Sequence, residues 1–409
     1  MSTIKSMRLH IGILGQTNAG KSTLLNTITK QNVSIVSAQA GTTTDPVEKP
    51  MELKPFGPVL FIDTAGYEDY SNLGQVREKK TNKYLDRLDV AIVVIHGTTV
   101  GESDKKIVQK LRLKKIPLCV CLPKIHSDSL SKSITHWLHA HSIPFFINDL
   151  HDSREQFLHD FVSCLQKVVS PEWNATPKMI TDFTKPGDII VLVIPIDKEA
   201  PKNRIILPQQ QAIRDVLDQG SISIVTGVSE LANVLRLCKQ KPSLVVTDSQ
   251  AFKEVFSIVP PTIPVTGFSV LLARMKGDLE IFLRGIGAIQ RLDSGDRVLI
   301  LEACSHNPFC NDIGREQIPH GIVNMTNKNI EFDVVSGHDF PESLSNYKLI
   351  IHCGGCILNR KEIQNRIQIA IENNVPITNY GFVLSYMHGD LGRALEILMR
   401  SEKKEDLIS

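Results

Sequence analysis

The chain has 409 residues, of which 42% are hydrophobic and 22% charged, and its formal net charge is +2. This length predicts two or three domains, and the composition is typical of a soluble globular protein. The small net charge argues against a broad basic surface for nucleic acid or an anionic membrane. The first residues do not fit a signal peptide, and no apolar run reaches the roughly 20 residues of a membrane span. We therefore expect a cytoplasmic protein with no nucleic-acid partner and no membrane partner.

Short apolar runs alternate with helical patterns over residues 9–168, which predicts a parallel α/β sheet covered on both faces. The expected strands are residues 9–14, 59–63, 90–96 and 118–122. The expected helices are residues 21–29, 105–113 and 157–168. Two prolines and several polar residues at 170–177 then indicate a linker.

The same α/β pattern resumes after the linker in two further blocks. Their expected strands are residues 188–195, 222–225, 244–247, 298–302, 349–352 and 376–379. Their expected helices are residues 209–217, 230–238 and 361–372. The sequence therefore predicts an α/β protein of three domains, at residues 1–170, 171–262 and 263–409.

The chain contains eight cysteines, and in a cytosolic protein of this size they indicate metal ligands or buried small side chains rather than disulfides. Four of them lie within apolar strand or helix patterns and are expected in the core, namely Cys119, Cys121, Cys164 and Cys238.

A nucleotide-binding motif lies between the first expected strand and helix. Residues 15–22 read Gly-Gln-Thr-Asn-Ala-Gly-Lys-Ser, which fits the P-loop pattern GxxxxGK[ST]. The glycines let backbone N–H groups face the phosphates, Lys21 reaches the β- and γ-phosphates, and the Ser22 hydroxyl holds Mg²⁺. The expected nucleotide-binding residues of this loop are Gly15, Asn18, Ala19, Gly20, Lys21, Ser22 and Thr23.

Two more motifs follow in the order found in P-loop GTPases. Asp63 ends an apolar strand and opens a DxxG motif, in which Asp63 supports the Mg²⁺ ion and the Gly66 N–H meets the γ-phosphate. Thr43 lies between the two motifs and would complete the shell of the Mg²⁺ ion. The three motifs together resemble the GTPases of the TrmE and Era type.

This resemblance implies a potassium ion beside Asn18, although an amide that caps the loop is the alternative. Tyr67 stands where Ras-like proteins carry the glutamine that orients water. We therefore assign no catalytic residue and expect slow, K⁺-dependent hydrolysis.

The motif for guanine departs from the family, because Pro123-Lys124-Ile125-His126 replaces Asn-Lys-x-Asp. Only Lys124 of this motif is retained. The sequence therefore leaves two alternatives for each property: specific or unspecific binding of GTP, and hydrolysis or no hydrolysis of it.

Cysteine and histidine also follow two strands of the third block. Cys304 and His306 follow residues 298–302, and His352, Cys353 and Cys356 end or follow residues 349–352. Because ligands gather outside the carboxyl ends of parallel strands, we expect these side chains to converge. Thiolates and histidine suit an iron–sulfur cluster or zinc, and buried core cysteines are a further alternative.

CxH followed by 45 residues and HCxxC resembles the FeFe-hydrogenase maturation GTPases, the HydF family. The resemblance implies a 4Fe–4S cluster on Cys304, Cys353 and Cys356, with His306 and His352 as fourth ligands or as hydrogen-bond donors to cluster sulfur. Cys310 lies outside the signature. The three domains would then be a P-loop GTPase domain, a small dimerisation domain and an iron–sulfur cluster-binding domain.

The resemblance also implies a function. The protein would be a homodimer or higher homo-oligomer that carries a di-iron precursor to apo FeFe-hydrogenase. Two radical-SAM maturases would build this precursor. GTP or GDP with Mg²⁺ would bind the P-loop domain, which would act as a conformational switch. The alternatives are a regulatory or degenerate GTPase with a redox-sensing cluster, a tRNA-modifying GTPase, and a scaffold that has lost GTPase activity. The near-neutral charge argues against the tRNA-modifying enzyme.

Overall fold

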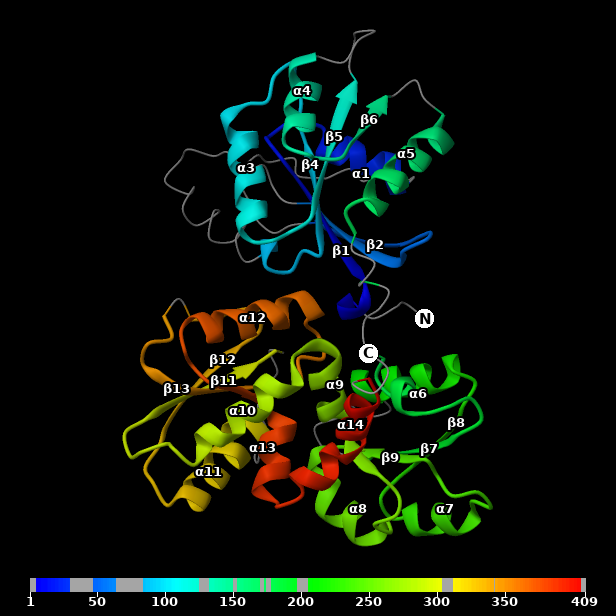
Figure 1. The fold of residues 1–409 in the computed structure, drawn as a ribbon, viewed down its shortest axis with the longest axis vertical. Coiled ribbons are helices and arrows are strands. Elements are labelled where there is room, and N and C mark those ends of the chain that lie inside the picture. Colours follow the sequence, from blue (N-terminus) through cyan, green and yellow to red (C-terminus); the bar gives the residue numbers. More distant parts are fainter. Residues whose placement is uncertain are drawn as a thin grey trace. The chain divides into compact units, whose positions relative to one another are not determined.

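The computed structural model describes residues 5–29, 47–63, 84–124, 132–149, 153–169, 173, 178–196, 205–303, 312–341 and 343–405. The chain divides into two compact units, Met1–Ala175 and Thr176–Ser409, and each is described by itself (Figure 1).

The first unit is built on one mixed sheet. In its described residues, six strands lie in the order β2-β3-β1-β4-β5-β6, and all neighbours are parallel except the β2–β3 pair. The strands are β1 (Leu9–Gly15), β2 (Val47–Leu53), β3 (Gly57–Asp63), β4 (Val90–Val94), β5 (Leu118–Lys124) and β6 (Phe145–Asp149). The antiparallel edge strand β2 was not expected. Pro50 lies within β2, and proline is tolerated in a sheet at its edge.

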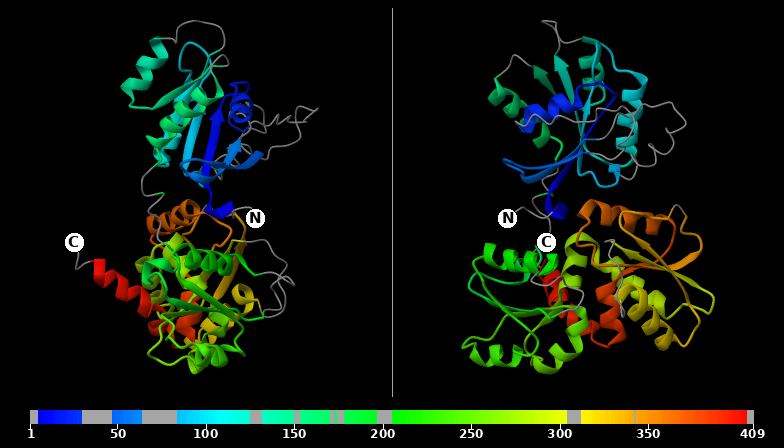
Figure 2. Two further views of the ribbon diagram at one scale, coloured as in Figure 1. Left: turned by 90° about the vertical axis from the view of Figure 1, so that its right-hand side faces the viewer. Right: turned by 180° about the vertical axis from the view of Figure 1, so that it is seen from behind.

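Helices cover both faces of this sheet, as the apolar runs of the strands predicted. They are α1 (Lys21–Thr29), α3 (Glu102–Leu113), α4 (Lys132–Ala140) and α5 (Arg154–Gln166). One apolar cluster joins the sheet to α1 and α5, and another joins it to α3 and α4 (Figure 1 and Figure 2). Cys119, Cys121 and Cys164 are buried here as expected, whereas Cys238 of the second unit is partly exposed.

Among its described residues, the second unit holds two four-stranded parallel sheets. The order is β10-β9-β7-β8 in one sheet and β12-β11-β13-β14 in the other. The first consists of β7 (Ile189–Val193), β8 (Ile222–Thr226), β9 (Leu244–Thr247) and β10 (Val265–Gly267). The second consists of β11 (Arg297–Glu302), β12 (Glu331–Ser336), β13 (Tyr347–His352) and β14 (Ile377–Asn379).

The described helices of this unit are α6 (Leu207–Asp218), α7 (Leu231–Leu237), α8 (Phe252–Ile258), α9 (Phe268–Lys276), α10 (Leu279–Ile289), α11 (Ile318–Thr326), α12 (Arg360–Glu372), α13 (Tyr380–Met387) and α14 (Leu391–Glu405). The domain limits expected from sequence stay predictions, although β10 pairs with β9 and extends the first of these sheets to Gly267. Among the described helices, none is long and apolar enough to cross a membrane.

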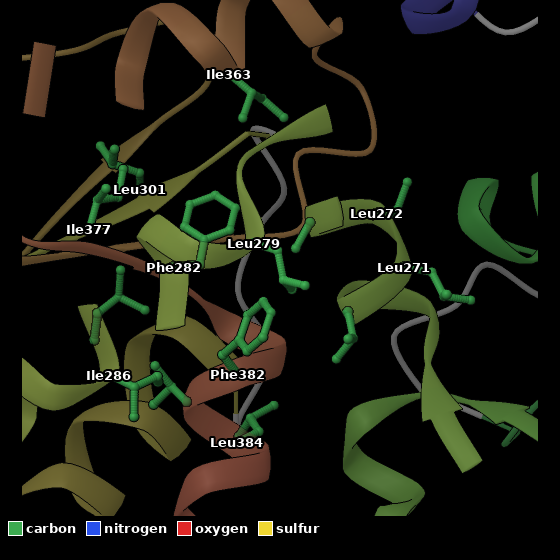
Figure 3. Packing of buried hydrophobic residues seen from close by; sticks show 14 of the residues in the cluster. Leu271, Leu272, Leu279, Phe282, Ile286, Leu301, Ile363, Ile377, Phe382 and Leu384 are labelled. Carbon is green, nitrogen blue, oxygen red and sulfur yellow. The ribbon is translucent and has the colours of Figure 1, made fainter. Parts of the chain in front are cut away.

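One apolar core joins both sheets of the second unit, and it includes buried side chains of β7, β9, β11 and β13. Phe282 of α10 and Phe382 of α13 are neighbours within it (Figure 3). Their rings are tilted at 45° to each other, with centroids 6.2 Å apart. A second cluster packs α7 and α8 against the first sheet. The C-terminal helix α14 returns to β10, where the Thr266 hydroxyl donates to the Ala394 carbonyl at 2.7 Å. The Arg393 guanidinium donates to carbonyls at the end of α8.

Two glycines of α10 provide a matched test of this packing. A Cβ atom at Gly285 would lie 2.1 Å from the Ile377 carbonyl oxygen, which is backbone of β14. The nearest atom to a Cβ at Gly287 is 3.8 Å away, at the end of the Arg291 side chain. We expect Gly285→Ala to lower the free energy of unfolding by about 1–3 kcal/mol through overpacking. Gly287→Ala should raise it by about 0.5–1 kcal/mol through helix propensity. Urea unfolding followed by circular dichroism checks both, and equal effects would contradict the packing described here.

Candidate functional site

The P-loop connects the end of β1 to the start of α1, and its backbone requires special residues. Gly15 and Gly20 have φ angles of +150° and +96°, and Asn18 has +61°. A Cβ atom at Gly15 would lie 2.6 Å from the Val94 carbonyl oxygen, so glycine is needed at this close approach to β4. Ala19 is buried and Thr23 is exposed in the first turn of α1.

The Lys21 side chain folds back over the loop. Its ammonium donates to the Gly15 and Gln16 carbonyls at 3.1 and 2.8 Å. Burial lowers the pKa of Lys21, and the nearby Asp63 carboxylate opposes this shift. The lysine therefore lies where the motif predicts a phosphate-binding cation.

Asp63 ends β3, and parallel pairing of β1 with β3 places it opposite Ile13, two residues before the P-loop. Burial raises the pKa of Asp63 to about 6, against the effects of Lys21 and a hydrogen bond from Ser22. Asp63 Oδ1 is buried and has no hydrogen-bond partner in the described part of the chain. A carboxylate oxygen beside a serine hydroxyl is the donor set that Mg²⁺ prefers. Thr43 and Gly66 lie outside the described residues.

The strand end expected to bind the guanine base differs from the family pattern, unlike the P-loop that is expected to bind the phosphates. A Cβ atom at Gly20 would lie 3.6 Å from Pro123 Cγ, so the proline ring packs against the P-loop. Pro123 is paired in register with Asn148 of β6, and Lys124 is the last residue of β5. Asn148 is 4% exposed, and its Oδ1 has no partner among the described residues. Because β6 pairs with β5, residues 145–149 form the edge strand of the sheet. His126 lies outside the described residues.

The second site lies at the carboxyl ends of the adjacent strands β11 and β13. The Cys353 N–H donates to the Leu301 carbonyl at 2.8 Å. The Cys353 Sγ atom accepts hydrogen bonds from the N–H groups of Ala303, at 3.0 Å, and Gly355, at 3.4 Å. Ala303 immediately precedes Cys304, so β11 and β13 end side by side. The expected convergence of the cysteine and histidine side chains stays a prediction. Cys304, His306 and Cys310 lie outside the described residues.

A tight turn separates Cys353 from Cys356. Gly355 has a φ angle of +59°, and a Cβ atom there would lie 2.5 Å from Ile363 Cδ1 of α12. Both cysteines are partly exposed. Burial raises the pKa of the Cys356 thiol, and the Lys276 ammonium opposes that rise.

His352 is buried and uses both ring nitrogens within the protein. Nδ1 is 2.6 Å from the Cys353 carbonyl oxygen, and Nε2 is 3.1 Å from a guanidinium nitrogen of Arg366. These bonds suit a neutral ring that donates from Nδ1 and accepts at Nε2. Burial, followed by the Arg366 charge, lowers the pKa of His352 to about 3. In this geometry His352 orients the loop, and a bond to iron would require one of these hydrogen bonds to break.

Sequence reasoning missed Lys276, which ends α9 and is 2% exposed. Its ammonium donates to three carbonyls of the cysteine loop, and burial lowers its pKa to about 8. The local signal is a lysine in the last turn of a mostly apolar helix, where Arg274 is a second basic residue.

Within the described residues, no group of three or more His, Cys, Asp or Glu side chains is placed to hold a metal ion. The described part contains two of the three cysteines of the signature. N–H donors to a cysteine sulfur and a nearby buried cation are features that fit an iron–sulfur cluster, whose thiolates carry negative charge.

Three family models match the chain in succession. The model described as 50S ribosome-binding GTPase matches residues 10–124. The hydrogen maturase F dimerization domain matches residues 179–277, and the hydrogen maturase F tetramerization domain matches residues 280–397.

Three curated relatives each match about a quarter of this chain. The mitochondrial 5-taurinomethyluridine-[tRNA] synthase subunit GTPB3 of Danio rerio is 37% identical over 105 residues, which are 25% of this chain and 21% of that protein. GTPase Der of Mycoplasmopsis agalactiae is 38% identical over 28% of this chain and 27% of its own length. GTPase Era of Pasteurella multocida is 33% identical over 28% of this chain and 38% of its own length. The chain thus spans well under half the length of these relatives.

A crystal structure of Era from Aquifex aeolicus matches with a TM-score of 0.34 and 20% identity, over 56% of this chain and 97% of that chain. At this TM-score the likeness supports no further conclusion. The two hydrogen maturase F models together match more than half of the chain and follow directly on a GTPase domain. This chain therefore belongs to the hydrogen maturase F family.

Proposed function

We propose that this protein is a cytoplasmic scaffold for maturation of FeFe-hydrogenase. It binds GTP or GDP with Mg²⁺, holds a 4Fe–4S cluster on Cys304, Cys353 and Cys356, and delivers a di-iron precursor to the apo-hydrogenase. Two radical-SAM maturases build this precursor on the scaffold. The matched dimerization and tetramerization domains support a homo-oligomer.

One observation carries the cluster assignment. The Cys353 sulfur accepts a hydrogen bond from Ala303, the residue before Cys304, and lies on a tight loop with Cys356. Ala303, which precedes Cys304 in the sequence, and Cys353 thus lie at neighbouring strand ends. Hydrogen bonds to sulfur and local charge are the main protein contributions to the potential of such a cluster.

The nucleotide assignment is supported by Lys21 over the P-loop and by Ser22 beside Asp63. Thr43 and Gly66 would sense the γ-phosphate, so that binding and hydrolysis change the affinity for a maturase or hydrogenase. Asn18 would hold K⁺, and turnover would be slow without it.

A second candidate function is a degenerate GTPase with a redox-sensing cluster and no di-iron cargo. It is favoured by Pro123, which packs at the P-loop where the family carries asparagine. Infrared bands of bound CO and cyanide after co-expression with the two maturases would separate the candidates. Their presence supports the scaffold, and a cluster without them supports the sensor.

Removal of single cysteines tests the cluster site. After anaerobic reconstitution with iron and sulfide, Cys304→Ala, Cys353→Ala and Cys356→Ala should each lose most of the 4Fe–4S signal in electron paramagnetic resonance and at least half of the bound iron. Cys238→Ala is the matched control, because this cysteine is partly exposed on another helix end and should leave both unchanged. Full iron content in any of the three variants would remove that cysteine from the site.

Restoring the guanine motif tests the nucleotide site. The double variant Pro123→Asn with His126→Asp regains a carboxylate that accepts two hydrogen bonds from guanine, each worth about 1.5–3 kcal/mol. Calorimetry should therefore show at least a ten-fold gain in affinity for GTP and no gain for ATP. Equal gains for both nucleotides would refute the assignment of this strand end to the base.

A further inference from the structure

Lys276 is a fully buried lysine that belongs to one matched domain and contacts the other. It ends α9, the helix that follows β10, and lies within the match to the dimerization domain. All three carbonyls that it contacts lie within the match to the tetramerization domain. Its side chain therefore joins the two sheets of the second unit at the cysteine loop.

The ammonium satisfies three backbone acceptors at once. Lys276 Nζ donates to the carbonyls of Gly355 at 3.0 Å, Cys356 at 3.0 Å and Leu358 at 2.8 Å. These residues lie between β13 and α12, outside any helix or strand of the described chain. Buried carbonyls need hydrogen-bond partners, so the ammonium determines the path of the loop on both sides of Cys356.

The charge at the cysteine loop suits an anion. Lys276 Nζ lies 3.0 Å from the Cys356 carbonyl oxygen, and its positive charge attracts thiolates at Cys353 and Cys356. Glu362, 5% exposed, also attracts Lys276, and it accepts a hydrogen bond from Arg366 at 3.2 Å. Glu302 at the end of β11 is buried as well, and it pairs with Arg315 at 2.9 Å. Each of these two carboxylates therefore has an arginine partner, and thiolates of the loop would add negative charge beside the ammonium.

We propose that Lys276 is the positioning residue of the cluster loop and the positive charge that stabilises the anionic cluster bound there. The proposal rests on the proposed function for the presence of the cluster. With three cysteine thiolates, the cluster becomes more negative when it takes up an electron. A nearby ammonium stabilises the reduced form more than the oxidised form, so Lys276 raises the reduction potential.

Three substitutions separate the two parts of this role. Lys276→Gln keeps N–H donors without the charge, Lys276→Met removes both, and Lys276→Arg keeps both. Lys328→Gln is the control. Lys328 also donates to a backbone carbonyl, that of Leu292, but this carbonyl precedes the start of β11, at the end of the strand away from the cysteine loop. The full-length chain is used for all variants.

Hydrogen exchange of residues 353–358 in the iron-free protein tests the positioning. We expect at least ten-fold faster exchange in Lys276→Met, a smaller effect in Lys276→Gln, and no change in the control. A redox titration of the reconstituted protein, followed by electron paramagnetic resonance, tests the charge. The potential should become more negative in Lys276→Gln and Lys276→Met and stay near the wild-type value in Lys276→Arg and Lys328→Gln.

The outcomes distinguish this proposal from the proposed function. Wild-type protein that takes up no iron and sulfide would overturn the proposed function and the electrostatic part of the Lys276 proposal, while hydrogen exchange still decides the positioning part. A wild-type cluster with unchanged potential in Lys276→Gln would overturn the electrostatic part alone. Unchanged exchange in Lys276→Met would overturn the positioning part.

Discussion

Parallel pairing of neighbouring strands is the constraint on which both candidate sites depend. Parallel neighbours end at the same edge of a sheet, so residues distant in sequence meet there without any local signal. Pairing of β1 with β3 puts Asp63 beside the P-loop lysine. Pairing of β11 with β13 puts Cys353 within hydrogen-bond distance of Ala303. The same geometric rule thus builds a phosphate site in one unit and a thiol site in the other.

Sequence predicted all the central strands of the described sheets but missed four edge strands, namely β2, β6, β10 and β12. Central strands such as β4 and β11 read as continuous apolar runs, which only a covered parallel strand requires. The strands β2 and β12 lie at sheet edges and are largely half-exposed, so their polar sequences resemble loops. Between residues 268 and 289, α9 is buried on most sides and gives no distinct pattern, whereas α10 carries an exposed polar stripe with Glu280 and Arg284 that sequence reasoning missed.

In the candidate sites, residues that belong to sequence motifs could be predicted, whereas residues that reach the sites only through tertiary folding could not. Motif residues such as Lys21 and the cysteines were predictable, because their spacing along the chain reflects the chemistry that they perform. Their partners were not. A lysine at a helix end such as Lys276 is ordinary, since cations there favour the helix dipole. Its importance arises from tertiary folding, which brings it to a loop about 80 residues later. The neutral state of His352 likewise depends on burial and on Arg366, which lies 14 residues later in the chain on α12.

The return of α14 to β10 has a mechanical consequence for the second unit. The chain leaves the first of its two sheets through α9 and comes back to it through α14, where Thr266 and Arg393 fasten the helix. The sheet that carries the cysteine loop is therefore tethered at both ends, and a rotation of one sheet against the other would have to break both attachments. A common apolar core also joins the two sheets, so we expect the pair to move as one block.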